Sequence, residues 1–239
     1  MAEAALWGLL AASSLIVGAE LALRFHLPRR TVGLIMALGV GMLIASIAFE
    51  LVAPAFLALS TITASAAFLS GGLVFFWGDW YIGRLGGNRR KGRQDEQTGL
   101  GIALGTVLDG IPESAVLGMS LAGGGAVSAS LLVAIWTSNI PESLGSTDAL
   151  VSSGKSRRWL RIMWIGITAV SGAAAAFGYR FISNNSLATG GVVEAFAGGA
   201  LLTMIADEMA PEAFERSGLL TGIATALGFV IGFALSAAE

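Results

Sequence analysis

The sequence predicts an all-α polytopic membrane protein with eight transmembrane helices. Its composition is 55% hydrophobic and only 13% charged, whereas soluble domains contain about 25% charged residues. Eight apolar runs are each long enough to cross a bilayer as a helix, which takes roughly 20 residues. Lys and Arg are distributed unevenly between these runs. We therefore predict a single transmembrane domain over residues 1–239, with a cytoplasmic loop at about residues 84–99.

The predicted spans are separated by short segments that are more polar. They cover residues 4–23, 32–54, 61–82, 100–121, 127–149, 160–181, 190–212 and 217–237. No positively charged segment precedes the first run, so we expect a membrane span there instead of a cleavable signal peptide. Many of the 33 glycines are spaced by four residues, which favours close packing of helices in lipid.

The loops after the first, third, fifth and seventh runs hold almost all the basic residues. Of the 14 Lys and Arg residues, only Arg180 lies outside these loops. Cytoplasmic loops of membrane proteins are enriched in Lys and Arg. We therefore expect these loops in the cytoplasm and both termini outside, in a cell (plasma or inner) membrane. The basic run at Arg89–Arg93 is interpreted as a topology signal, and no nucleic-acid partner is predicted.

A short motif occurs twice inside the apolar runs. Ile111-Pro112-Glu113-Ser114 recurs 29 residues later as Ile140-Pro141-Glu142-Ser143. A charge at mid-membrane is costly and is by default a sign of function. Proline removes a helix hydrogen bond, so backbone carbonyls become available beside each carboxylate. We expect spans 4 and 5 to be antiparallel and to surround one polar site.

The spacing of polar residues near this motif predicts a set of oxygen ligands. Helix positions four apart share a face, so Asp109 lies with Glu113, and Ser138 with Glu142, next to Asn139. Carboxylate, amide and hydroxyl oxygens bind hard or borderline divalent cations. A lone Ser or Asn can instead serve only to hold helices together. Three carboxylates at one depth argue for a cation site.

An internal repeat is visible at a shift of 158 residues. Gly41–Phe56 and Gly199–Phe214 match at seven of sixteen positions, including Glu50 with Glu208. Chance similarity of apolar segments is the alternative, but it does not generate matched glutamates. Spans 1–3 would then correspond to spans 6–8 in the opposite orientation, around spans 4 and 5. Inverted repeats are common in transporters, and Glu50 and Glu208 are predicted near opposite mouths of a cation pathway.

These motifs resemble those of the ZIP (Zrt/Irt-like) divalent metal transporters, and the similarity runs over all eight spans. The family patterns are roughly His-Asn-x-Pro-Glu-Gly in span 4, His-Glu-x-Pro-Glu-Gly in span 5 and His-Glu-x-x-Pro-Glu in span 7. Here they read as Asp109–Ser114, Ser138–Ser143 and Asp207–Glu212. The Pro-Glu pairs are kept, whereas every histidine of these patterns is replaced, and span 6 has no acid.

The resemblance implies a fold with outward-facing termini, a three-helix inverted repeat and a binuclear metal site on spans 4 and 5. It also adds Asp207 and Glu208 to the candidate metal ligands. We therefore predict a transporter that moves zinc-, iron- or manganese-type ions toward the cytoplasm. The predicted partners are these ions and the lipid bilayer. A homodimer is one option for the oligomeric state, and no prosthetic cofactor is predicted.

Two other functions were weighed. One is a proton- or cation-coupled carrier of another substrate that uses the same carboxylates. The other is an intramembrane enzyme, which the absence of His-Glu-x-x-His and of a nucleophile–base set disfavours. The chain also has no G-x-x-x-x-G-K-[ST] phosphate loop, which argues against a built-in ATPase.

The ligand types predict weak ion selectivity. The chain has no cysteine, and its only histidine, His26, lies in an Arg-flanked loop. Zinc sites usually contain His nitrogen or Cys sulfur, whereas oxygen sites suit Mn²⁺ and, by ligand type, Fe²⁺. We expect broad divalent transport in which Mn²⁺ or Fe²⁺ competes well with Zn²⁺.

Overall fold

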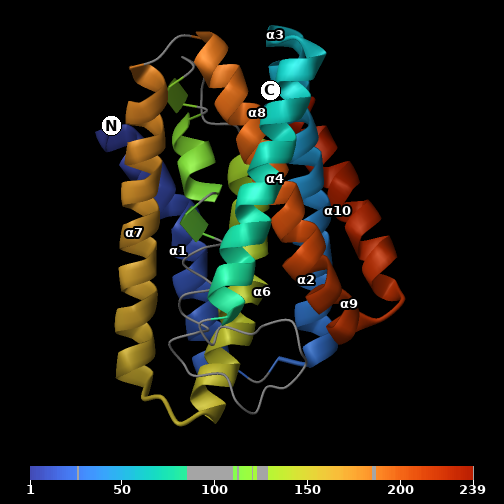
Figure 1. Ribbon diagram of the computed structural model, residues 1–239. Coiled ribbons are helices and arrows are strands. Elements are labelled where there is room, and N and C mark those ends of the chain that lie inside the picture. Colours follow the sequence, from blue (N-terminus) through green and yellow to red (C-terminus); the bar gives the residue numbers. More distant parts are fainter. Residues whose placement is uncertain are drawn as a thin grey trace.

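The computed structural model describes residues 1–25, 27–84, 110–111, 113–119, 121–122, 129–184 and 187–238, and within these ranges no strand occurs. The helices form one bundle with their axes broadly aligned (Figure 1). Their bounds are α1 (Ala2–Arg24), α2 (Arg29–Ser46), η1 (Ile47–Val52), α3 (Ala53–Ala58), α4 (Thr61–Arg84), α6 (Ala129–Ser152), α7 (Arg157–Ser183), α8 (Leu187–Met204), η2 (Ile205–Met209), α9 (Ala210–Ser217) and α10 (Leu220–Ser236). The described positions between 110 and 122 are also helical.

Five helices in the described part of the chain are long and apolar enough to cross a membrane. They are Ala2–Arg24, Arg29–Ala58, Thr61–Tyr81, Arg157–Ser183 and Gly190–Ser217. The helix Leu220–Ser236 is apolar but shorter. These helices agree with the predicted all-α polytopic membrane protein, whereas the count of eight spans stays a prediction.

The outer surface of the bundle is apolar, as lipid contact requires. On α10, Ile223, Leu227 and Val230 share one face and are 71%, 54% and 60% exposed. A continuous apolar face of this kind marks contact with a membrane or a partner. Both termini lie toward one end of the bundle and the turn between α6 and α7 lies toward the other (Figure 1). The arrangement fits the prediction that both termini are on the same side.

The predicted runs match the helices closely where the two can be compared. The largest difference is five residues, between the predicted end at 212 and the observed end at Ser217. Most of the predicted run 100–121 lies outside the described residues. The positions of the apolar runs therefore predicted the helix boundaries well.

Glycine brings α2 and α10 into close contact. A Cβ atom added at Gly41 would overlap the backbone of Thr225, and one at Gly228 would overlap the backbone of Leu38. Larger residues at these glycines would push the two helices apart. Small residues allow this close approach between helices in membranes.

The same pair of contacts recurs between α8 and α4. A Cβ atom at Gly199 would overlap the backbone of Phe68, and one at Gly71 would overlap that of Phe196. Gly199 and Phe196 follow their α2 counterparts by 158 positions, and Phe68 and Gly71 precede their α10 counterparts by 157. Helix pairs from the two ends of the chain are therefore packed in the same way.

One long rod is formed by α2, η1 and α3, and the other by α8, η2 and α9. The two rods also contact each other near their ends in matching ways. Gly33, near the start of α2, lies against Ser217 at the end of α9, and Gly191, near the start of α8, lies against Leu59 after α3. These contacts show that α2 is antiparallel to the rod formed by α8, η2 and α9. Gly191 follows Gly33 by 158 positions, and Leu59 precedes Ser217 by 158 positions.

The rods that hold the matched glutamates each contain a π-helical turn before a proline. η1 contains Glu50 and precedes Pro54, while η2 contains Glu208 and precedes Pro211. In both, the residue before the proline donates its N–H to the carbonyl five positions earlier. A wide turn accommodates a proline, which lacks an N–H and crowds the preceding turn, and such turns are frequent at functional sites. Sequence analysis did not predict these turns.

Candidate cation site

α6 carries three of the predicted ligands on an unbroken helix. Pro141 lies inside α6, which continues through it to Ser152. Proline has no N–H to donate to the preceding turn, but it does not end this helix. Ser138 and Asn139 are 1% and 3% exposed, and Glu142 is half-buried. These oxygen-bearing groups therefore lie in the interior of the bundle.

Two serine hydroxyls near the site bond to their own helix. The Ser138 hydroxyl donates to the carbonyl of Ile135 at 3.0 Å, and the Ser143 hydroxyl donates to the carbonyl of Asn139 at 2.8 Å. A hydroxyl that donates one bond still has lone pairs for a ligand. Ser138 is therefore compatible with both its predicted roles, as a helix contact and as a weak ligand.

Glu113 is the most deeply buried acid of the motif. It is 2% exposed, and its helical segment packs closely on α7, where Ala115 lies against Gly178 and Gly118 against Ala175. One oxygen of Glu113 and one of Glu142 are buried and accept no hydrogen bond from the described residues, although both residues also have other interactions. Burying a charge is costly unless it is paired or neutralised. A carboxylate at either position is therefore stabilised by a nearby positive charge or by protonation.

α1 and α2 enclose the ligand-bearing part of α6. Gly39 of α2 lies against Ser138, and further along α2 the hydroxyls of Ser46 and Ser130 are 2.9 Å apart. From α1, Gly18 packs against the carbonyl of Ile140. The order of the α2 contacts shows that α2 and α6 are antiparallel.

The matched glutamates lie in different parts of the bundle. Glu50 accepts a hydrogen bond of 2.5 Å from the hydroxyl of Ser236 in α10, and it follows Ser46 by one turn. It therefore lies toward the N-terminal end of α6. Asp207 and Glu208 are half-buried in η2, and Glu208 precedes Arg216 by eight residues, or about 12 Å of helix.

The described residues do not test the whole predicted ligand set. Among the described residues, no group of three or more His, Cys, Asp and Glu could hold a metal ion. Asp109, His26 and Pro112 lie outside the described residues. The grouping of Asp109 with Glu113 and Glu142 therefore stays a prediction.

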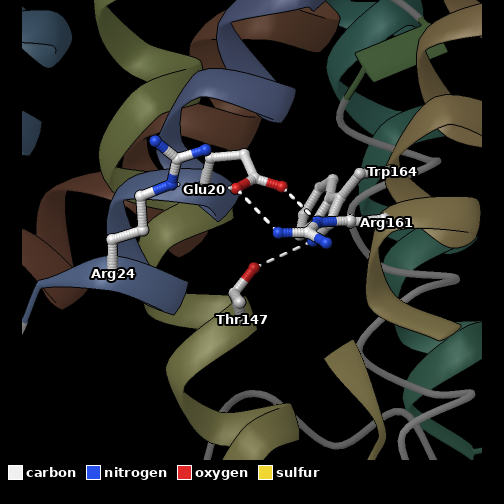
Figure 2. Close-up of polar contacts among 5 residues, drawn as sticks. All are labelled: Glu20, Arg24, Thr147, Arg161 and Trp164. Carbon is white, nitrogen blue, oxygen red and sulfur yellow. Dashed lines mark hydrogen bonds and ion pairs between the residues drawn. The ribbon is translucent and has the colours of Figure 1, made fainter. Parts of the chain in front are cut away.

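Several polar contacts were missed by the sequence reasoning. Glu20 of α1 binds Arg161 of α7 in a two-point ion pair of 2.5 and 3.2 Å, with Arg24 at 3.3 Å (Figure 2). The indole of Trp164 donates to the hydroxyl of Thr147 at 2.8 Å in the same region. Spacing of four predicts the Glu20–Arg24 contact, whereas no sequence signal joins Glu20 to a residue 141 positions away.

A second ion pair lies on α9. Arg216 Nη2 donates to Glu212 Oε1 at 2.6 Å, and these side chains are 19% and 39% exposed. The spacing of four was the available signal, but Arg216 was interpreted only as a topology residue.

No protein-family model matches this chain, and no curated protein is similar enough to match it. The functional argument therefore depends on the residues and on their placement.

Proposed function

We propose that this chain is a membrane-embedded cation carrier whose substrate site lies in the bundle interior beside α6. The burial of Glu113, together with half-buried Glu142, carries this proposal. Acids inside a membrane bundle are costly and generally mark a cation or proton pathway. Buried Asn139 and Ser138 add neutral oxygen ligands. We use the name cation route for the proposed path of the ion past Glu50, Glu113, Glu142 and Glu208.

The paired contacts support an eight-span topology with an inverted repeat. The α2–α10 and α8–α4 pairs use corresponding glycines, the two long rods are antiparallel, and each has its π-helical turn at the matched glutamate. Two halves related in this way can exchange roles, which opens a central site to each side in turn. The proposed topology places both termini outside and the turn between α6 and α7 in the cytoplasm.

The proposed substrate is a divalent metal ion of the zinc, iron or manganese type, moving toward the cytoplasm. The Pro-Glu motifs at Glu113, Glu142 and Glu212 resemble those of ZIP transporters. Carboxylate and amide oxygens are suitable ligands for such ions. The ion is the cargo and not a resident cofactor.

Uptake into proteoliposomes tests this function. Glu113→Gln and Glu142→Gln keep the side-chain shape and remove the charge, so we expect uptake of Mn²⁺ and Zn²⁺ to fall at least about tenfold. The matched control is Asp148→Asn, an exposed acid on the same helix, which should transport normally. If Glu142→Gln transports as well as the control does, the carboxylate is structural. If the unchanged protein moves protons or an organic cation but no metal, the alternative carrier is correct.

A further inference from the structure

Arg216 is placed between the helices that enclose the candidate site. Its Cβ atom lies beside Gly33 of α2, and its guanidinium lies over Gly145 of α6. A Cβ atom at Gly145 would be 2.5 Å from Arg216 Nη2 and 3.1 Å from its Cζ. The absence of a side chain at Gly145 therefore makes room for the charge. Glu212, one turn earlier on α9, holds the guanidinium at 2.6 Å.

This position is one helix turn from Glu142. Gly145 follows Glu142 by three residues, or about 4.5 Å of helix rise, so both positions share a face of α6. On the other side, Glu212 and Arg216 are spaced by four and share a face of α9, and Glu208 lies about one turn before Glu212, in the π-helical turn η2. The guanidinium thus lies about one turn beyond Glu142 along α6 and one turn beyond Glu212 along α9.

The opposite end of the bundle lacks such a charge at the related positions. At a shift of 158 residues, Arg216 corresponds to Ala58 and Glu212 to Pro54. There, Ala58 and Leu59 pack against Gly191, as Arg216 and Ser217 pack against Gly33. Apolar side chains are therefore sufficient to close this kind of helix contact. The helix contact itself therefore does not require the charge at Arg216, which the distribution of basic residues among the loops explains only as a topology signal.

We propose that Arg216 is a tethered cation that closes this end of the cation route and competes with the transported metal for Glu212. Without metal in this part of the route, the guanidinium neutralises Glu212. A divalent ion that passes Glu142 displaces the guanidinium from Glu212, because two cations so close together repel each other. Arg216 is then a positioning residue that weakens metal binding at this end. The inference rests on the proposed function.

Equilibrium binding of Mn²⁺ alone tests the competition. The concentration of free Mn²⁺ is measured from its electron paramagnetic resonance signal. Arg216→Met removes the competing charge, so Mn²⁺ should bind about two- to fivefold more tightly. Gly145→Ala should shift affinity in the same direction by less, since its methyl group displaces only the flexible end of Arg216. The matched control is Arg161→Met, which breaks the ion pair between α7 and Glu20 of α1 without touching Glu212, and should leave affinity unchanged.

The combined variant Arg216→Met/Glu212→Gln should lose the gain, because the competition acts through Glu212. Unchanged or weaker binding in both Arg216→Met and Gly145→Ala would overturn the proposal. If Arg216→Met does not elute as a folded species, Gly145→Ala alone decides. If the wild-type protein binds Mn²⁺ but the variants do not change its affinity as described, only the proposed role of Arg216 is contradicted. Wild-type protein that neither binds nor transports metal contradicts the proposed function as well.

Discussion

The hydrogen bond between Trp164 and Thr147 gives a measurable test of how α7 is held to α6. The indole N–H donates at 2.8 Å (Figure 2), and the two residues are 1% and 0% exposed. Thr147 follows Glu142 on α6 by five residues. The bond therefore joins α7 to the helix that carries the candidate ligands.

Its magnitude follows from burial and from the membrane setting. Hydrogen bonds between membrane helices average about 0.6 kcal/mol and reach about 1.7 kcal/mol. Both partners are fully buried here, so each single change leaves one group without its partner, at about 1–3 kcal/mol. We expect Thr147→Val and Trp164→Phe to destabilise the protein separately. The double variant should cost less than their sum by about 1 kcal/mol, because both polar groups are then absent.

A double-mutant cycle on the purified protein measures this coupling. Each variant is unfolded reversibly in mixed detergent, and the loss of helix is monitored by circular dichroism. The control cycle pairs Trp164→Phe with Thr221→Val, whose hydroxyl bonds within the region of α9 and α10. Distant changes add within about 0.5 kcal/mol, so the control should show no coupling. A Trp164–Thr147 coupling no larger than the control would refute the reasoning.

Two further predictions follow from the ligand types and from the charge distribution. Excess Mn²⁺ or Fe²⁺ should reduce Zn²⁺ uptake, because the route offers oxygen ligands; zinc uptake that is insensitive to both ions would contradict the oxygen-ligand argument. A cysteine introduced at Lys91 of this cysteine-free chain should react only from the cytoplasmic side, and labelling from outside intact cells would contradict the topology.

Sequence reasoning located the helices because the membrane imposes one requirement along each span. An apolar run of sufficient length indicates a helix whatever it packs against. The same uniformity hides the packing face, since a helix that is apolar all round has no amphipathic pattern. On α8, the face toward α4 is identified by the close approaches of Gly199 to Phe68 and of Phe196 to Gly71, which only the assembled structure shows. Lengths were therefore predictable, and helix rotations were not.

The candidate site, too, could be predicted from the sequence only in part: its acidic residues were identified, and its contacts between helices were not. Acids inside apolar runs identified Glu113, Glu142, Glu50 and Glu208, because lipid makes such residues conspicuous. The role of Arg216 depends on a contact with Gly145, 71 positions earlier in the chain, and a glycine carries no chemical signal. Contacts of this kind appear only once the helices are assembled.

The paired contacts and the single Arg216–Glu212 pair have different consequences for transport. In the proposed topology, matched packing at the two ends would allow two conformations of similar energy, each open to one side. In the proposed role of Arg216, a charge at one of the two related helix contacts would weaken the metal affinity of that side. It cannot set the direction of net movement, because at equal metal concentrations a passive carrier has no net flux. The proposed role of Arg216 is therefore a difference in half-saturating metal concentration between the two sides, and the metal gradient determines the direction.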